Sequence, residues 1–146
     1  MHNYTIRPMT IADYDSVMTL MQQTPGVAVR EADSRDATNA YLERNPQLSF
    51  VAEVDHQIIA CIMSGHDGRR GYLQHLAVLP AYRRYGIANA LVECCLAKLE
   101  QIGILKSHID VFQTNALAIA YWESQGWQLR TDIRRYSLIR AGGDNV

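Results

Sequence analysis

A strand, a proline, a glycine-containing loop and a long helix follow one another in this chain and constrain its fold more than any other feature. The segment 72–78 is short and rich in apolar and β-prone residues, which is typical of a buried strand. Pro80 ends that strand. Apolar residues then recur at spacings of four and three, on one helical face: Ile87, Leu91, Cys95, Leu99 and Ile102. A helix start leaves backbone N–H groups unpaired and positively polarised. The small residues Gly86 and Ala88 would therefore let a phosphate approach this helix.

Apolar periodicity and turn residues predict the other elements. The expected strands are residues 4–8, 49–54, 58–65, 72–78, 107–112, 127–133 and 135–139, and the expected helices are residues 11–23, 35–44, 87–102 and 116–124. Short connections between the second, third and fourth strands favour antiparallel pairing, whereas the helical connection to the fifth favours parallel pairing. The sequence thus predicts a mixed α/β (α+β) fold whose sheet has an antiparallel first half, a parallel β-α-β crossover and helices on both faces.

Three polar or glycine residues mark helix ends. Thr10, with Asp13 three residues later, is typical of a capping arrangement, and Ser34 is placed to cap the second helix. Gly103 is placed to end the long helix. Residues 141–146 are expected to form a frayed tail.

Composition limits the class of protein. The 146 residues predict one domain, 1–146, with a central sheet of about seven strands. A net charge of -1 does not fit a nucleic-acid partner, which calls for a basic face. Three cysteines lie inside apolar strand or helix patterns, so no disulfide framework is expected and a reducing cytoplasm is indicated. No N-terminal basic and apolar run is present, and no apolar stretch approaches ~18 residues, so neither export nor a membrane span is expected.

Two segments carry a resemblance to a known family. Arg83, Gly86 and Ala88 follow a strand that ends Leu-Ala-Val and a proline, and in this context they resemble the pyrophosphate-binding signature of the GNAT superfamily of acetyl-CoA-dependent N-acetyltransferases. Residues 115–127, N-A-L-A-I-A-Y-W-E-S-Q-G-W, are similar to that family's N-x-x-A-x-x-(aromatic)-Y-E-x-x-G-F segment. The order of elements also matches, and the resemblance covers nearly the whole chain.

The resemblance implies acetyl-CoA as the acetyl donor and a set of residues that contact it. The acetyl-pantetheine arm would lie along Leu76, Ala77 and Val78, and backbone amides of the loop would hold the pyrophosphate. The expected cofactor-binding residues beyond the strand are Arg83, Arg84, Tyr85, Gly86, Ile87, Ala88, Asn89 and Asn115. Two arginines at a helix start repel its dipole, and a bound anion would offset that cost. In an arbitrary protein the same residues form a plain core strand and a solvated pair of arginines.

Three side chains are candidates for catalysis: Asp110, His75 and Trp122. In relatives that acetylate the N-terminal alanine of a ribosomal protein, an acidic general base aligns with Asp110 and a tyrosine general acid aligns with Trp122. Trp122 departs from that pattern, because an indole N–H donates a hydrogen bond but cannot deliver a proton. His75 is a candidate because a histidine side chain can serve as an acid or a base near neutral pH. Asp110 is otherwise a structural carboxylate, and His75 a packed or water-linked histidine.

Other polar groups have weaker functional interpretations. Glu31, Asp33 and Arg35 lie in the segment that overhangs the acceptor cleft in this family, and the polar turn 66–70 is either a solvated hairpin loop or a substrate-selecting one. The five histidines show no i, i+4 pairing and Cys94-Cys95 lacks Cys-x-x-Cys spacing, so no metal site is expected. No nucleophile motif of the G-x-S-x-G type is present.

The sequence therefore predicts an N-acetyltransferase in which the acceptor amine attacks acetyl-CoA directly. The acceptor is a small amine, an amino acid or a protein N-terminus, and the protein is a monomer or a homodimer. Two alternatives stay open. A non-catalytic acyl-CoA sensor would bind the cofactor without turnover, and a generic phosphate-binding module would bind adenine nucleotides that lack pantetheine equally well.

Overall fold

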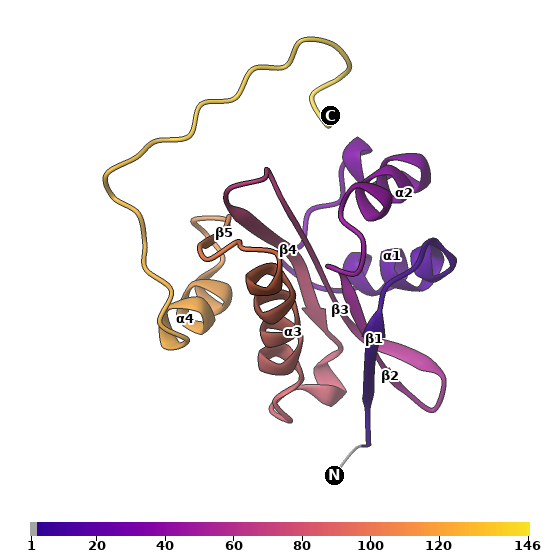
Figure 1. The fold of residues 1–146 in the computed structure, drawn as a ribbon. Coiled ribbons are helices and arrows are strands. Elements are labelled where there is room, and N and C mark those ends of the chain that lie inside the picture. The colour runs from indigo at the N-terminus through magenta and orange to yellow at the C-terminus, as the bar shows by residue number, and fades with distance from the viewer. Residues whose placement is uncertain (1–2) are drawn as a thin grey trace. The chain divides into compact units, whose positions relative to one another are not determined.

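A computed structural model describes residues 3–146 of the chain. The polypeptide divides into two compact units, one ending at Asp110 and the other formed by Val111–Val146. The first unit contains the sheet and three α-helices, and the second contains one α-helix followed by an extended segment (Figure 1).

The elements of the described residues follow the predicted order. The strands are β1 (Thr5–Pro8), β2 (Phe50–Val54), β3 (Gln57–His66), β4 (Gly71–Val78) and β5 (Ser107–Ile109). The α-helices are α1 (Tyr14–Gln22), α2 (Arg35–Arg44), α3 (Ile87–Gln101) and α4 (Ala116–Ser124), and three 3-10 turns are η1 (Ile11–Asp13), η2 (Glu31–Asp33) and η3 (Pro80–Tyr82). The helix expected over 11–23 thus begins with a 3-10 turn. Ser34 caps α2 as predicted, because its side chain accepts a hydrogen bond from the Ala37 N–H at 3.2 Å.

The sheet is mixed, as predicted, and its strands lie in sequence order. Strands β1 to β4 pair antiparallel, and short connections join β2 to β3 and β3 to β4, whereas α1 and α2 lie between β1 and β2. Strand β4 pairs parallel with β5 after the α3 crossover. The parallel pairing is short. It runs from Gly71 opposite Ser107 to Leu73 opposite Ile109, so the remainder of β4 extends past β5.

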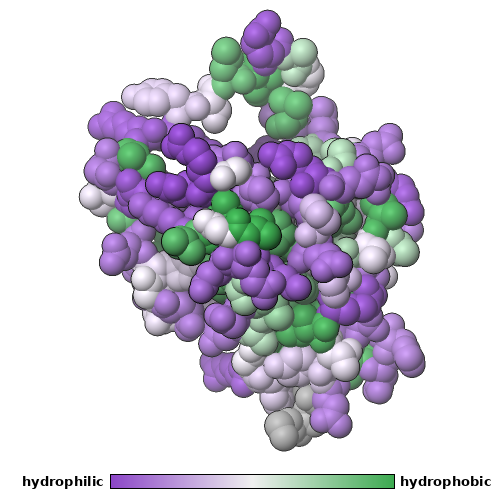
Figure 2. Space-filling view, viewed as in Figure 1, coloured by the Kyte–Doolittle hydropathy of each residue, from purple (hydrophilic) through white to green (hydrophobic). Residues whose placement is uncertain are grey.

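The prediction of about seven strands is not confirmed, since the described residues form a five-stranded sheet. Residues 127–133 and 135–139, expected as closing strands, are extended without ladder pairing, and the fifth strand ends at Ile109 instead of residue 112. The alternating pattern of 127–139 matches a strand, but a strand needs a pairing partner and a buried face. Leu129, Tyr136 and Leu138 are 79%, 87% and 82% exposed. In Figure 2, hydrophobic residues lie at the visible surface among hydrophilic ones.

Helices cover both faces of the sheet, as predicted (Figure 1). On the α1 side, one buried cluster joins the helix to three strands: Met9, Val17, Leu20, Met21, Val51, Cys61, Met63 and Ala77. On the other side, α3 packs on β2, β3 and β4 through its own buried residues: Ile87, Leu91, Val92, Cys95 and Leu99. Four of these were predicted from the helical spacing. Ile102, the fifth residue of that pattern, follows the helix and is 54% exposed.

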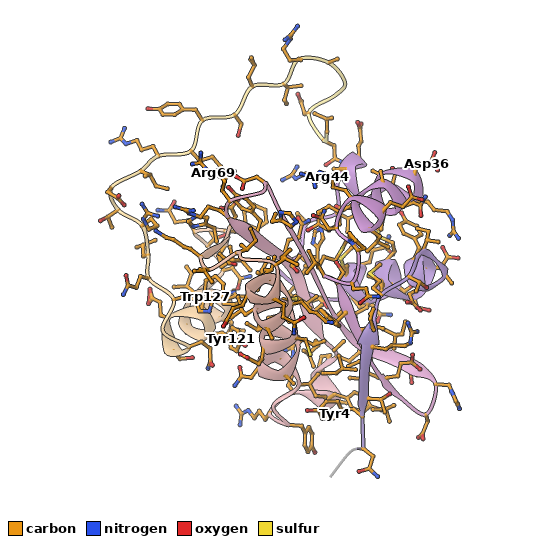
Figure 3. All side chains as sticks on the ribbon, viewed as in Figure 1. Tyr4, Asp36, Arg44, Arg69, Tyr121 and Trp127 are labelled. Carbon is orange, nitrogen blue, oxygen red and sulfur yellow. The ribbon has the colours of Figure 1, made fainter. Side chains whose placement is uncertain are left out.

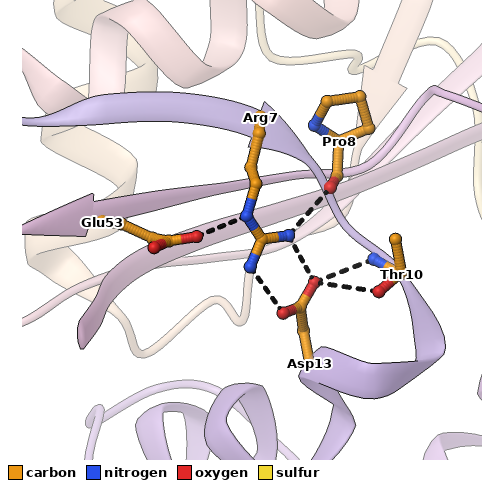
Figure 4. A network of polar contacts seen from close by, with 5 residues as sticks. All are labelled: Arg7, Pro8, Thr10, Asp13 and Glu53. Atoms are coloured by element: carbon orange, nitrogen blue, oxygen red, sulfur yellow. Dashed lines mark hydrogen bonds and ion pairs between the residues drawn. The ribbon is translucent and has the colours of Figure 1, made fainter. Parts of the chain in front are cut away.

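A charged network fastens β1 to β2 and to η1 (Figure 4). Arg7 donates to the two carboxylate oxygens of Asp13 at 2.7 and 2.8 Å and also donates from Nε to Glu53. The Thr10 N–H donates to Asp13 Oδ2 at 2.9 Å, which confirms the predicted capping arrangement. The Arg7 hydrogen bonds hold the pKa of the buried Asp13 carboxyl below its usual range. Within residues 3–146, no helix combines the length and the apolar content needed to cross a bilayer.

Candidate active site

Strand β4 contains a β-bulge where the acetyl-pantetheine arm was predicted to lie. Cys61 pairs with Ala77 and Met63 pairs with Gln74, so the single β3 residue between them faces two β4 residues, His75 and Leu76. A bulge of this kind bends its strand and re-aims side chains, and bulges are over-represented beside active sites. His75 has a φ of 54°, a left-handed conformation that non-glycine residues rarely adopt.

The edge of β4 that follows the bulge is separated from β5. Pairing between the two strands ends at Leu73 and Ile109, so β5 does not cover the backbone of residues 74–78. Leu76 is half-buried, and Ala77 and Val78 are buried. Backbone groups on this edge of β4 therefore have no ladder partner in β5, and peptide groups need another partner when they leave water.

The loop between β4 and α3 has a fixed, irregular conformation. Turn η3 ends the strand, and the Arg83 side chain folds back so that its Nε donates to the Val78 carbonyl at 3.1 Å. Arg84 and Gly86 have φ values of 67° and 80°, and Gly86 is the residue before the first turn of α3. Two left-handed residues so close together turn the chain sharply into the helix.

The start of α3 fits a phosphate. The N–H groups of Ile87 and Ala88 belong to the first helical turn, where no carbonyl four residues earlier accepts a bond within the helix. A side-chain carbon added at Gly86 would meet no atom within 4 Å, so the space next to these amides is open. Arg83, Arg84 and Tyr85 are exposed beside it. Polarised amides, open space and two cations are the features that favour binding of an anion.

His75 contacts a residue of the α1–α2 connection. Its Nε2 lies 2.8 Å from Oδ1 of Asp33 in η2, and the side chains are only 14% and 13% exposed. The buried thiol of Cys61 in β3 donates to the His75 carbonyl at 3.3 Å. Burial raises the pKa of Cys61 to about 12, which keeps this thiol protonated and able to donate.

Asp110, another candidate base, is exposed and lies one residue past the end of β5. The prediction that Asp110 belongs to a strand over residues 107–112 is therefore wrong. The reason is the divergence of the two strands, which leaves residue 110 opposite no β4 residue in the ladder.

The two remaining predicted site residues belong to the second unit. Asn115 is the N-cap of α4, and its Oδ1 accepts a hydrogen bond from the Ala118 N–H at 3.1 Å. Trp122 is buried and packs edge-on against both Tyr121 and Trp127, with ring centroids 5.0 and 4.8 Å away. Tyr121 and Trp127 lie on α4 and just after it (Figure 3). Burial raises the pKa of the Tyr121 hydroxyl.

Sequence reasoning missed the partners of two residues that it singled out. It named both Asp33 and His75, but nothing in the sequence joins positions 42 residues apart. It treated Arg83 as a cation for the phosphate and did not anticipate that its Nε bonds to Val78. For metal, the described residues contain no group of three or more candidate ligands, while His2 lies outside them.

Comparisons with known proteins agree with this geometry. The model of the acetyltransferase (GNAT) family matches residues 14–127. An acetyltransferase of Pectobacterium atrosepticum is 34% identical over 111 residues, which cover 76% of this chain and 78% of the relative. The solved structure of the ribosomal-protein-S18-alanine N-acetyltransferase from Escherichia coli has a TM-score of 0.70 and 26% identity, with 85% of this chain and 77% of that chain covered.

A second solved structure shares the fold at lower sequence identity. The PaiA N-acetyltransferase from Thermoplasma acidophilum, in complex with coenzyme A, has a TM-score of 0.78 and 18% identity, covering 88% of this chain and 91% of that chain. The family match spans most of the sequence, including the β4–α3 loop and α4. The chain belongs to the acetyltransferase (GNAT) family.

Proposed function

We propose that this enzyme transfers an acetyl group from acetyl-CoA to a primary amine, which attacks the thioester carbonyl directly. Acetyl-CoA is the acetyl donor, as membership of the family implies. The observation that carries the proposal is the loop at the start of α3, where left-handed Arg84 and Gly86 precede the first-turn amides. We assign the pyrophosphate to the amides of residues 84–89 and the acetyl-pantetheine arm to residues 76–78.

The direct mechanism needs little from the protein. A thioester is already activated, so the enzyme holds the amine against the carbonyl, neutralises the amine and stabilises the oxyanion. Two observations support this role for β4: the bulge at residues 75 and 76, and the end of pairing with β5 at Leu73. Buried Cys61 and Cys95 do not favour a covalent acetyl-cysteine, because burial raises both pKa values to about 12.

The acceptor class is a small amine, an amino acid or a protein α-amine. A lysine-like amine costs about 4–5 kcal/mol to deprotonate at pH 7, whereas an α-amine costs only ~1 kcal/mol, at about 1.4 kcal/mol per pKa unit. The similar structure from Escherichia coli is named as an N-acetyltransferase of an alanine in ribosomal protein S18, which supports an α-amine as acceptor. Asn115 is proposed as a further cofactor contact through groups other than the Oδ1 that caps α4.

An amine panel tests this proposal, with release of free coenzyme A thiol as the readout. Small amines, amino acids and peptides with free N-termini are each incubated with enzyme and acetyl-CoA. Turnover with at least one class is expected. A protein that binds acetyl-CoA and acetylates no amine would instead be an acyl-CoA sensor. Binding of ADP as tight as that of acetyl-CoA would indicate a generic phosphate-binding module.

A further inference from the structure

The contact between His75 and Asp33 joins the β4 bulge to the α1–α2 connection. The Nε2···Oδ1 distance is 2.8 Å, and both side chains are largely removed from solvent. A histidine at a bulge beside the proposed acetyl arm is well placed for proton transfer, and its partner determines which ring nitrogen carries the proton. Since Nε2 faces a carboxylate, neutral His75 carries its proton on Nε2 and leaves the lone pair on Nδ1.

Two contacts hold His75 in place, one on its backbone carbonyl and one on its ring. Its φ of 54° is a strained conformation for a non-glycine residue in a strand, and such strain persists only where surrounding contacts impose it. The Cys61 thiol of β3 holds the His75 carbonyl at 3.3 Å, and Asp33 holds the ring. His75 is therefore pre-organised and not a freely rotating surface group.

Asp33 is fixed by contacts of its own. The Arg30 N–H donates to Oδ2 at 2.8 Å, and the Tyr14 hydroxyl of α1 donates to the Asp33 carbonyl at 2.7 Å. Burial by itself would raise the pKa of Asp33, but the hydrogen bonds from His75 and from the Arg30 N–H outweigh it, and the pKa lies below its ordinary value. The carboxylate is thus ionised and accepts from Nε2–H at neutral pH.

We propose that His75 is the general base of the acetyl transfer and that Asp33 is its positioning residue. This inference rests on the proposed function. The amine nitrogen attacks the carbonyl carbon, the N–C bond forms and the C–S bond breaks. The amine proton moves to Nδ1 of His75 and passes from there to the leaving thiolate or to solvent, which yields the amide and free coenzyme A. Asp33 stabilises the imidazolium that forms in between.

Among the described residues, titratable and charged groups contact the pair from η2 and the residue before it, from α1 and from β3. Arg30 and Asp33 belong to the η2 turn and the residue before it, Tyr14 belongs to α1, and Cys61 belongs to β3. Tyr14 and Cys61 contact carbonyl groups of the pair and not its titrating atoms. Asp33 is therefore the group whose removal should change the tautomer of His75.

The substitution Asp33→Asn is a sharp test because Arg30 sets the orientation of the new side chain. The Arg30 N–H needs an acceptor, so the amide oxygen of the asparagine takes the place of Oδ2 and the NH₂ group faces His75. That NH₂ donates to Nε2, so the ring proton must lie on Nδ1. Nδ1 then has no lone pair with which to accept the amine proton. Asp33→Asn thus inverts the tautomer while preserving the shape of the side chain.

The first experiment measures kcat/KM against pH for wild type, His75→Gln, Asp33→Asn and the double variant. We expect each single variant to lose roughly 10²-fold at pH 7 together with the low-pH limb of the profile, and the double variant to lose no more than the worse single. Asp36→Asn is the matched control, because Asp36 is an exposed carboxylate of α2 that projects from the helix (Figure 3). It should keep the wild-type profile. The proposal would be overturned if the losses of kcat/KM in the two single variants added up in the double variant and the low-pH limb of the profile stayed unchanged.

The second experiment needs no turnover. Nitrogen NMR of the histidine ring reports the tautomer directly, and we expect Nε2–H in wild type and Nδ1–H in Asp33→Asn, with both proteins equally folded by thermal unfolding. An Nδ1–H tautomer in the wild type would overturn the positioning role. If wild type binds acetyl-CoA but acetylates no amine, the base role fails with the proposed function, whereas the tautomer measurement still decides the role of Asp33.

Discussion

Arg7 and Asp13 form a two-point contact in which both carboxylate oxygens of Asp13 accept from the guanidinium, at 2.7 and 2.8 Å. The contact ties the first strand to the turn that begins α1, and Glu53 extends it to β2 (Figure 4). Asp13 is 7% exposed although it is charged. A buried carboxylate with a paired guanidinium is a point where stability depends on pH.

Asp13→Asn is expected to lower the free energy of unfolding by roughly 1–3 kcal/mol at pH 7, since it weakens a charged hydrogen bond and leaves Arg7 with one carboxylate. The folded pKa of Asp13 is depressed, so its contribution is present above the unfolded pKa of ~3.9 and is lost as pH falls through the folded value. The difference between wild type and variant in denaturant unfolding should therefore shrink toward low pH. Asp15→Asn is the control, because Asp15 is 92% exposed and 3.8 Å from Arg35, and it should change stability by less than ~0.5 kcal/mol.

Gly86→Val should abolish the stabilisation that acetyl-CoA confers, which for wild type is about 2.7 kcal/mol at a hundred times the dissociation constant. The valine side chain would occupy the open space beside the α3 amides and would strain the left-handed backbone. Gly103→Val is the control that separates backbone strain from obstruction of the phosphate. Gly103 also has a left-handed φ of 87° and open space around it, but it follows the other end of α3. The Gly103→Val variant should be less stable than wild type but should still be stabilised by acetyl-CoA. A normal thermal shift in Gly86→Val would mean that the phosphate is bound elsewhere.

The three cysteines should react slowly with thiol reagents under native conditions. Burial raises the pKa of Cys61 and of Cys95 to about 12, and raises that of the half-buried Cys94 as well, so thiolate is scarce at neutral pH. Cys94 should label first because its side chain is the most accessible of the three. Mass spectrometry after incubation with acetyl-CoA should find no acetyl-cysteine, and detection of one would contradict direct attack.

Trp122→Phe should keep most of the activity and lose about 1 kcal/mol of stability, the usual contribution of an aromatic pair. Its ring packs against Tyr121 and Trp127, which is a structural role, and its indole cannot act as an acid. Tyr121→Phe removes the nearby hydroxyl and should also leave turnover largely unchanged. A large fall in kcat in this second variant, with acetyl-CoA affinity preserved, would identify Tyr121 as the acid.

Asp110→Asn should retain the low-pH limb of the kcat/KM profile that His75→Gln loses. Asp110 is exposed and lies past the end of β5, whereas His75 is oriented at the bulge by the half-buried carboxylate of Asp33. The loss in His75→Gln should be larger with a lysine-like acceptor than with an α-amine, because their deprotonation costs differ by about 3 kcal/mol. Loss of the limb in Asp110→Asn alone would transfer the base role to that residue.

Features that depend on near neighbours in the chain could be predicted from the sequence. Helix α2 has the predicted bounds, since Ser34 caps it and Asn45-Pro46 ends it, and α3 starts after Gly86 as its apolar spacing required. The hairpins of the antiparallel half and the parallel crossover also follow from the lengths of the connections. The cofactor loop belongs to this class, because its strand, glycine and helix lie within a few residues of one another.

Features that depend on contacts between distant segments were decided by the tertiary structure. Residues 127–139 have a strand-like pattern but no ladder partner, and β5 stops at Ile109 where β4 diverges from it. The bulge at His75 arises from the register of β3 against β4, and the ring of His75 meets Asp33 only because α1, η2 and the sheet pack together. Strand pairing and side-chain packing bring together residues that are far apart in the sequence, and neither composition nor local periodicity contains that information. The identity of the family was therefore evident in the sequence, whereas the partner of the candidate base was set by the fold.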